Sequence, residues 1–281
     1  MIAIRPNPFR DIRCEISLRI SALLRNNGFE SCICPVFAEG EPGVIPEGLA
    51  TREIEEVVSR CSLILVVGGD GTILHVARRI HSHSVPLLGV NLGTKGFMAN
   101  LEPEEIPYVL QAARGEYSIS RRMKLDVSLY RDGKEICRDQ ALNDAVMHGY
   151  GDCIQITALC NGNRITAFSG DGIILSTPTG STGYSMSAGG PIVEPNAENI
   201  ILSPICAHMM SSRSFVLGPD SEITVEVDKL HTRRAYLAVD GNSVIDLASG
   251  DQVVIRRSES YTCMADLGLR NFYDIAFEKL R

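Results

Sequence analysis

The hydrophobic period of the chain changes near residue 120, and this change constrains the fold more than any other feature of the sequence. Before it, short apolar runs alternate with segments whose apolar residues recur every three or four positions. Such strands and helices in alternation predict a parallel sheet with helices on both faces. After it, apolar and polar residues alternate one by one, which is the pattern of antiparallel strands with one buried face.

The first part of the chain predicts several distinct elements. Leu63–Val67 is a continuous apolar run, as expected for a strand that is buried on both faces. The helical spacing of four apolar residues after it predicts a helix; these are Ile73, Val76, Ala77 and Ile80. Residues 31–37 predict a strand, and residues 51–61 predict a helix with Thr51 as its N-cap. Ile12, Ile16, Ile20 and Leu23 predict a further helix that stops at Gly28.

The second part predicts hairpins that build two packed sheets. Asp132-Gly133, Asn161-Gly162 and Asp240-Gly241 each separate two alternating runs, as two-residue hairpin turns do. Residues 271–280 return to a helical pattern, and we expect this helix to dock back on the first domain. The sequence thus predicts an α/β domain of residues 1–120 and 261–281, and a β-rich domain of residues 121–260.

Composition and charge exclude several classes of function. A net charge of −7 is a poor match to a nucleic-acid binder, which relies on Lys and Arg. No apolar run reaches the length of a membrane span, and the first residues do not resemble a signal peptide. Nine cysteines at irregular spacing, without a CxxC pair, indicate reduced thiols rather than zinc ligands. We therefore expect a cytoplasmic protein with no nucleic-acid or membrane partner and no metal held by its own side chains.

The glycine-rich turn Gly68–Thr72, GGDGT, follows the strand predicted for Leu63–Val67. Ligands of open parallel sheets bind beyond the carboxyl ends of the strands, where glycines and a helix start suit phosphate. Asp70 would repel phosphate, so a carboxylate here suits a general base or a metal ligand. The alternative is a plain turn in which Asp70 caps the helix. His75, one turn further on, is compatible with facing the phosphates or facing solvent.

Residues 91–100, NLGTKGFMAN, also follow a strand and carry two glycines. In a parallel sheet this loop would flank the same crevice as the GGDGT turn. Phe97 is compatible with stacking on a base or with filling the core. Lys95 is compatible with neutralising phosphate or with lying in solvent.

Two stretches of the second part suit a nucleoside. Asn143 and Asp144 offer the donors and acceptors that a ribose needs, although a turn or cap pair has the same composition. Residues 170–191 are dense in glycine and hydroxyl side chains. Either they line a ligand or they form a low-complexity linker, and the apolar residues on both sides favour the ligand.

Six motifs in order resemble the NAD kinase family: GGDGT, NLGTKGF, the Asn143-Asp144 pair, STPTGSTGYSMSAGGP, SPICAH and the DGN of residues 240–242. GGDGT alone also resembles diacylglycerol, sphingosine and 6-phosphofructo-kinases, whereas the STPTGST stretch is specific to NAD kinases. The resemblance implies a Rossmann-like domain, a β domain and a homodimer or homotetramer. It implies phosphoryl transfer from ATP to the 2′-hydroxyl of the adenosine ribose of NAD, with Mg²⁺ or another divalent cation. Some members of the family use polyphosphate.

Two other functions stay open at this stage: another kinase of the GGDGT group, acting on a lipid or a sugar phosphate, and a non-catalytic NAD or NADP sensor. A lipid kinase should expose an apolar surface, and the sequence shows no obvious one. An intact Asp70 disfavours a sensor.

The resemblance assigns roles to residues of this chain. Asp70 matches the family's catalytic base, and the residues expected at the donor phosphates are Gly68, Gly69, Gly71 and Thr72. The residues expected at NAD are Gly71, His75, Phe97, Asn143, Asp144, Asp171, Thr182, Gly183, Tyr184, Ser187 and Asn242. Asp171 matches an acidic residue that reaches the NAD of a neighbouring subunit. Three positions depart from the family pattern: Gly183 replaces alanine, Asn242 replaces glutamine, and Lys95 replaces an apolar residue.

Overall fold

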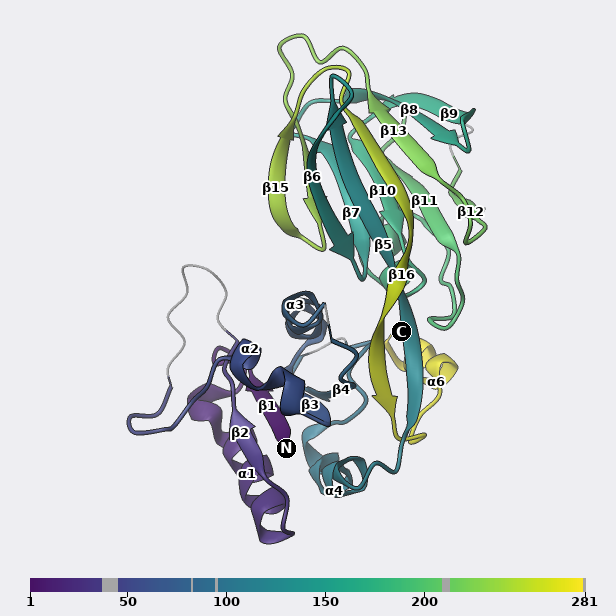
Figure 1. Ribbon diagram of the computed structural model, residues 1–281. Helices are drawn as coiled ribbons and strands as arrows, with labels where there is room; N and C mark the ends of the chain where they lie inside the picture. The colour runs from purple at the N-terminus through teal and green to yellow at the C-terminus, as the bar shows by residue number, and fades with distance from the viewer. Residues whose placement is uncertain (37–44, 82, 94–95, 209–212, 280–281) are drawn as a thin grey trace. The chain divides into compact units, whose positions relative to one another are not determined.

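The computed structural model describes residues 1–36, 45–81, 83–93, 96–208 and 213–279 (Figure 1). The chain divides into two compact units, Met1–Arg121 with Thr262–Arg281, and Arg122–Tyr261. Two long strands, β5 (Ser118–Arg131) and β16 (Gln252–Asp266), have residues in both units.

The first unit is built on a parallel sheet. Its strands follow the order β2 (Ser31–Ile33), β1 (Ile2–Pro6), β3 (Leu63–Gly68), β4 (Leu87–Asn91) and the end of β16. Each of these neighbours pairs in parallel, with Met264 of β16 opposite Leu87 of β4. The predicted parallel sheet is therefore confirmed.

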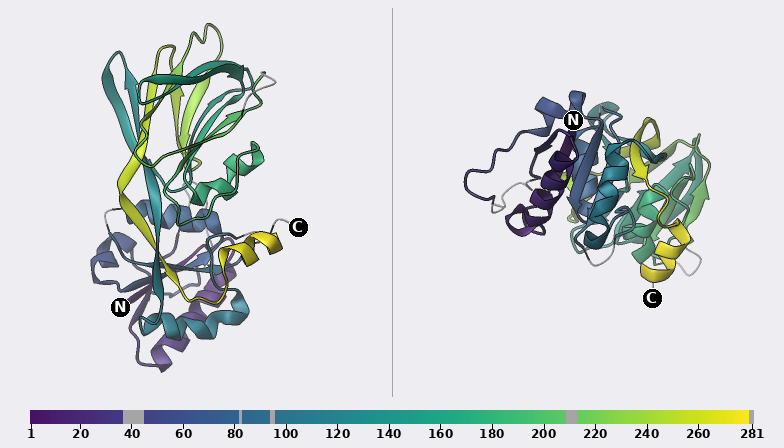
Figure 2. Two further views of the ribbon diagram at one scale, coloured as in Figure 1. Left: turned by 90° about the vertical axis from the view of Figure 1, so that its right-hand side faces the viewer. Right: turned by 90° about the horizontal axis from the view of Figure 1, so that it is seen from below.

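Helices cover both faces of this sheet (Figure 1). Helices α1 (Glu15–Asn26) and α4 (Val109–Ala113) lie on one face of the sheet. The right-hand view of Figure 2, from below, shows this face. Their residues Ile20 and Val109 pack in one buried cluster with Ile4 and Leu65 of the sheet. Helices α2 (Ile54–Val57) and α3 (Asp70–Arg79) lie on the other face. The remaining turns of this unit are 3-10 helices at Ile12–Cys14, Val58–Arg60 and Pro103–Tyr108.

Two local predictions for this unit are wrong. Thr51 is not a helix N-cap: it forms a β-bridge with Ile33, and α2 begins only after Glu53. Backbone pairing with the edge strand thus takes the place of capping at Thr51. The helix predicted from Ile12 begins at Glu15, after a 3-10 turn, and leaves Ile12 67% exposed. The stop at Gly28 is confirmed, because this glycine has a φ of 80°.

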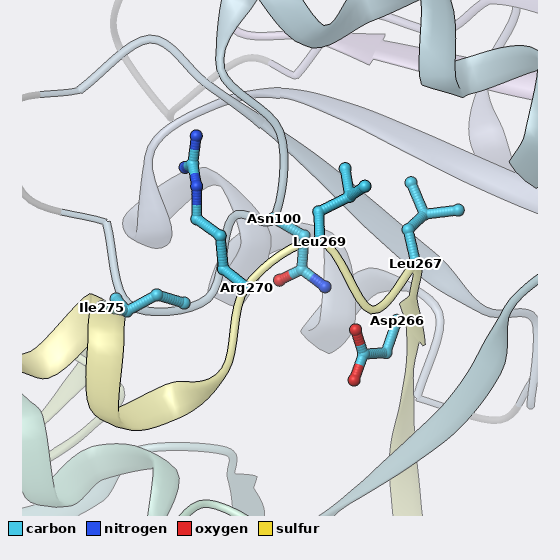
Figure 3. A pocket seen from close by; sticks show the side chains of 6 residues that line it. All are labelled: Asn100, Asp266, Leu267, Leu269, Arg270 and Ile275. Carbon is cyan, nitrogen blue, oxygen red and sulfur yellow. The ribbon is translucent and has the colours of Figure 1, made fainter.

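The C-terminal helix belongs to the first unit. Asn271 precedes α6 (Phe272–Lys279), and its Oδ1 accepts the N–H of Asp274 at 2.9 Å. Arg270 donates to Glu105 at 2.8 Å. Ile275 lines a small pocket in this unit together with Asn100 and Leu269 (Figure 3). The helix therefore returns to the α/β unit, as the sequence predicts.

The second unit is a sandwich of two mostly antiparallel sheets. One sheet has the order β12, β11, β10, β7, β14, β15. The other joins β16 to β13, β8 and β9, with β5 beside β16 and β6 beside β5. The bounds are β6 (Lys134–Ala141), β7 (Asp144–Gly149), β8 (Ile154–Cys160), β9 (Asn163–Gly170), β10 (Gly172–Ser176), β11 (Ile200–Ile205), β12 (Phe215–Leu217), β13 (Ile223–Val227), β14 (Ala235–Val239) and β15 (Asn242–Leu247). A single buried cluster fills the space between the sheets; Val127, Ile156, Leu175 and Leu237 belong to it.

The three predicted hairpin turns are present. Asp132, Asn161 and Asp240 have φ values of 51°, 50° and 49°, and the glycine that follows each of them also has a positive φ. Two successive positive φ angles fit the right-handed twist of paired strands.

The segment 170–191 is not a loop throughout. Its first part is the buried strand β10, which lies inside a sheet between β7 and β11. A 3-10 turn at Thr179–Thr182 and the short helix α5 (Tyr184–Ser187) follow. Because most of the segment forms a strand, a 3-10 turn and a short helix, the alternative of a low-complexity linker is wrong.

Candidate functional site

In the first unit, the loops that follow β1, β3 and β4 lie at one edge of the sheet, because the strands are parallel. Hydrogen bonds tie these loops together. The amide Nδ2 of Asn7, after β1, donates to Oγ1 of Thr72 at 3.0 Å. The backbone N–H of Leu92, after β4, donates to the carbonyl of Gly68 at 2.9 Å.

Asp70 is the first residue of α3, and Gly69 holds the N-cap position. The alternative in which Asp70 caps this helix is therefore wrong. The carboxylate of Asp70 instead accepts the N–H of Phe97 at 2.8 Å and the N–H of Met98 at 3.2 Å. Donors of this kind favour the ionised form of a carboxylate. Asp70 is half-buried, so it combines a fixed position with access from outside.

Glycines leave the backbone around Asp70 uncovered. A Cβ on Gly68 would lie 2.4 Å from Oγ1 of Thr72, so no other residue fits there without displacing the start of α3. A Cβ on Gly96 would lie 3.4 Å from Oδ1 of Asp70. Gly71 is exposed, and the space beside it is open. The backbone of this turn can therefore approach an anion closely.

The other predicted residues of this unit differ in their surroundings. His75 is half-buried, and its Nε2 is buried without a hydrogen-bond partner. Burial lowers the pKa of His75, and the positive charges of Arg5 and Arg79 act in the same direction. His75 is thus not the solvent-facing residue of the alternative interpretation. Phe97 is half-buried, and Lys95 lies outside the described residues.

In the second unit, one carboxylate organises the predicted nucleoside residues. Asp240 accepts the backbone N–H groups of Leu142 at 2.8 Å, Asn143 at 2.7 Å and Asp144 at 3.0 Å. Thr177 supports the same turn, since its Oγ1 donates to the carbonyl of Leu142 at 2.6 Å. The turn that carries Asn143 and Asp144 is therefore held from both sides.

Close packing fixes this turn further. A Cβ on Gly180 would lie 2.1 Å from the carbonyl oxygen of Asn143, so the 3-10 turn touches it directly. The side-chain oxygen of Asn143 is buried without a partner, as are the hydroxyls of Ser176 and Thr179. Buried polar atoms normally have a partner, so these three indicate a place for the polar groups of a ligand.

Asp144 is only 6% exposed. Burial, and secondarily the negative charge of Asp240, raises the pKa of Asp144 to about 7. Near neutral pH, a carboxyl group with this pKa is protonated in part of the molecules and charged in the others. It can therefore both donate and accept hydrogen bonds there.

Two of the remaining predicted residues of this unit, Gly183 and Asn242, lie beside the same turn or beside Asp240, which holds it. A Cβ on Gly183 would lie 3.4 Å from Nδ2 of Asn143, so the glycine leaves free the space that an alanine would take. Asn242 donates to the carbonyl of Asp240 at 2.9 Å, and Thr182 donates to the carbonyl of Thr179 at 3.2 Å. Tyr184 and Ser187 are exposed.

Asp171 lies between β9 and β10, which belong to different sheets. It is half-buried, and the thiol of Cys153 donates to its carboxylate at 3.7 Å. Cys153 also contacts Nε2 of His208 at 3.4 Å.

The sequence analysis missed Arg10 and did not give Asp240 a role. The guanidinium of Arg10 donates from Nη1 to the carbonyl of Leu92 at 3.3 Å and lies beside Gly69. The rule that pointed to the turn after β3 applies equally to the turn after β1, but it does not single out Arg10 among the residues of that turn. Nothing in the local sequence shows that Asp240 accepts three N–H groups from a turn about a hundred residues away.

Within the described ranges, no three His, Cys, Asp or Glu side chains cluster so that they could hold a metal ion. Along the same ranges, no helix has both the length and the apolar character needed to cross a bilayer.

Two family models match the chain. The ATP-NAD kinase N-terminal domain matches residues 40–116, and the ATP-NAD kinase C-terminal domain matches residues 142–267. An NAD kinase of Natranaerobius thermophilus is 36% identical over 99% of this chain and 97% of its own length. An NAD kinase of Geobacter sulfurreducens is 38% identical over 86% of this chain and 83% of its own length.

Solved structures agree with these matches. The crystal structure of yeast NADH kinase complexed with NADH has a TM-score of 0.86 at 25% identity, and covers 99% of this chain and 86% of that one. The structure of an NAD kinase from Archaeoglobus fulgidus in complex with ATP has a TM-score of 0.78 at 25% identity, and covers 100% of this chain and 99% of that one. The chain therefore belongs to the NAD kinase family.

Proposed function

We propose that the protein transfers the terminal phosphoryl group of ATP to the 2′-hydroxyl of the adenosine ribose of NAD, which gives NADP. The observation that carries this proposal is the single carboxylate Asp70, fixed by two backbone donors within a glycine-rich edge of the parallel sheet. The family relationship supports the same reaction. Nothing in the matches favours a lipid kinase, a sugar-phosphate kinase or a non-catalytic sensor.

Positioning and charge compensation dominate this chemistry, since the transition state of phosphoryl transfer is loose. Asp70 orients the attacking hydroxyl and accepts its proton. The turn of Gly68, Gly69, Gly71 and Thr72 binds the donor phosphates through backbone N–H groups at the start of α3. The fixed carboxylate and the uncovered backbone support these two roles at neighbouring positions.

The second unit binds NAD in this proposal. Asn143 and Asp144 hydrogen-bond a ribose, and the unpartnered side-chain oxygen of Asn143 supports this role. The further NAD contacts that we propose are His75, Phe97, Thr182, Gly183, Tyr184, Ser187 and Asn242.

The site fits a divalent cation, such as Mg²⁺, that binds together with ATP. Mg²⁺ usually keeps several waters and binds through one or two carboxylates together with substrate phosphates. The site supplies the single carboxylate Asp70 and, in the described part of the chain, no larger ligand cluster. The ion would neutralise charge on the phosphates that bind at the GGDGT turn.

We further propose that the protein is a homo-oligomer in which Asp171 completes the NAD site of an adjacent subunit. Mixing inactive D70N subunits with inactive D171A subunits should then restore part of the activity, because mixed assemblies contain intact sites. Absence of rescue despite proven subunit exchange would remove Asp171 from the site.

We also propose a cytoplasmic location. All nine cysteines lie in the described part of the chain as free thiols, which suits a reducing compartment.

The activity is tested with purified protein, ATP, Mg²⁺ and NAD, and NADP is measured with an NADP-specific dehydrogenase. Parallel reactions contain diacylglycerol or fructose 6-phosphate as the acceptor. The proposal predicts NADP formation that requires both ATP and the cation. Phosphorylation of the lipid or the sugar phosphate, without NADP, would contradict it.

A further inference from the structure

Arg10 lies at the glycine-rich edge of the first unit, beside the turn that carries Asp70. Its Nη1 donates to the carbonyl of Leu92, in the loop after β4. Its Nε lies 3.8 Å from the position that a Cβ on Gly69 would occupy, and its Nη1 lies 3.5 Å from the corresponding position on Gly93. The guanidinium therefore spans the glycines that follow β3 and β4.

The turn after β1 holds Arg10 in this place. The N–H of Phe9 donates to Oδ1 of Asn7 at 3.0 Å, and the N–H of Arg10 donates to the carbonyl of Asn7 at 3.0 Å. The N–H of Asn7 in turn donates to the carbonyl of Val67 in β3 at 2.8 Å. The backbone that carries Arg10 is thus fixed against β3, directly before the GGDGT turn.

The positive charge of Arg10 is not neutralised within the described part of the chain, where no carboxylate pairs with it. The neighbouring carboxylate, Asp11, is buried and accepts the N–H groups of Ile16 and Ser17 at the start of α1. Arg10 itself is exposed, and a guanidinium has five N–H groups, of which the Leu92 carbonyl takes one. In a chain with a net charge of −7, a fixed and available cation at this edge is distinctive.

We propose that Arg10 binds the phosphate chain of the phosphoryl donor and compensates its charge during transfer. This inference rests on the proposed function and adds a donor-binding residue from the turn after β1. A guanidinium suits phosphate because it can donate two parallel hydrogen bonds to it. Arg10 and the backbone N–H groups of the GGDGT turn then bind the phosphates together, while Asp70 acts on the acceptor hydroxyl.

The test compares R10Q and R10K with the wild type and with R19Q, which removes an exposed arginine on α1 in the same unit. KM for ATP, KM for NAD and kcat are measured for each protein. Binding of inorganic tripolyphosphate is measured separately by calorimetry without NAD, and binding of adenosine serves as a probe without phosphate. Circular dichroism melting confirms that each variant is folded.

For R10Q we expect KM for ATP and Kd for tripolyphosphate to rise roughly 10- to 100-fold, the range for losing a hydrogen bond to a charged group. KM for NAD and the affinity for adenosine should stay within about twofold, R10K should fall between R10Q and the wild type, and R19Q should match the wild type. Unchanged tripolyphosphate binding in R10Q, an equal loss in R19Q, or a rise confined to KM for NAD would each overturn the inference. A wild type that forms no NADP overturns the proposed function instead, and the tripolyphosphate measurement still decides the role of Arg10.

Discussion

Substitution of Asp144 with asparagine should stabilise the protein at neutral pH, because the structure buries this carboxyl group close to the negative charge of Asp240. The pKa of Asp144 rises from 3.8 to about 7 on folding. The folded state therefore holds a proton that the unfolded chain releases, so stability falls as the pH rises from 3.8 towards 7. A shift of about 3 units corresponds to about 4 kcal/mol of lost stability once the pH exceeds the folded pKa.

The assay is urea unfolding of the wild type and D144N at pH 5 and at pH 8. Asparagine does not titrate, so D144N does not lose stability at this position as the pH rises. From the same pKa values, the stability difference between D144N and the wild type should grow by roughly 2.5 kcal/mol between the two pH values. The control is D152N, which removes an exposed carboxylate of the same unit and should show no comparable growth. An equal difference between D144N and the wild type at both pH values would refute the reasoning.

Three further predictions concern single side chains. D70N should lower turnover at least about a hundredfold while NAD binding survives, because asparagine keeps the shape but cannot accept the proton; near-normal NADP formation would contradict the assignment. G180A should raise KM for NAD, because its Cβ would lie 2.1 Å from the carbonyl oxygen of Asn143, whereas G218A, with an open environment, should not; equal KM values would refute this. A hydrogen bond from Cys34 lowers the pKa of Cys32 to about 7, whereas Asp171 raises that of the exposed Cys206. Iodoacetamide at pH 7 should therefore label Cys32 first by mass spectrometry, and faster labelling of Cys206 would show the reasoning to be wrong.

The features that could be predicted from the sequence are those that depend on neighbouring residues. Asp132, Asn161 and Asp240 form the predicted turns because Asn and Asp tolerate a positive φ and glycine follows each of them. The continuous apolar run at Leu63–Val67 becomes a strand with both faces covered by helices. In both cases, the local backbone preference and the burial pattern favour the same conformation.

The predictions failed where a distant partner overrides the local pattern. Thr51 has the composition of an N-cap, but pairing with Ile33 of the edge strand takes its backbone. Residues 177–187 are rich in glycine and hydroxyls, and yet they form two short helical turns. Ser181 in these turns bonds to the backbone of Val193, and Ser185 bonds to Ser203 of β11. Tertiary contacts of this kind leave no periodic signal in the sequence.

The site shows the same division. Asp70 stands out in the sequence, because a carboxylate among glycines at the end of a buried strand has few structural uses. Arg10 carries no such mark, since exposed arginines are common, and its place depends on how the turn after β1 folds against β3. The position of Asp70 at this edge of the sheet could thus be predicted from its neighbours, whereas the position of the cation beside it required the arrangement of three strands.

Asp144 and Asp240 show how one structure gives two aspartates different tasks. Asp240 accepts three backbone N–H groups, which favour its charged form. Asp144 is buried close to that charge, and both the burial and the charge make the ionised form of Asp144 unfavourable. A ribose hydroxyl both donates and accepts hydrogen bonds, and a carboxyl group that keeps its proton near neutral pH can match both. Burial of Asp144, assisted by the charge of Asp240, therefore keeps a proton on this carboxyl group up to about pH 7, a state that suits the ribose contact proposed above.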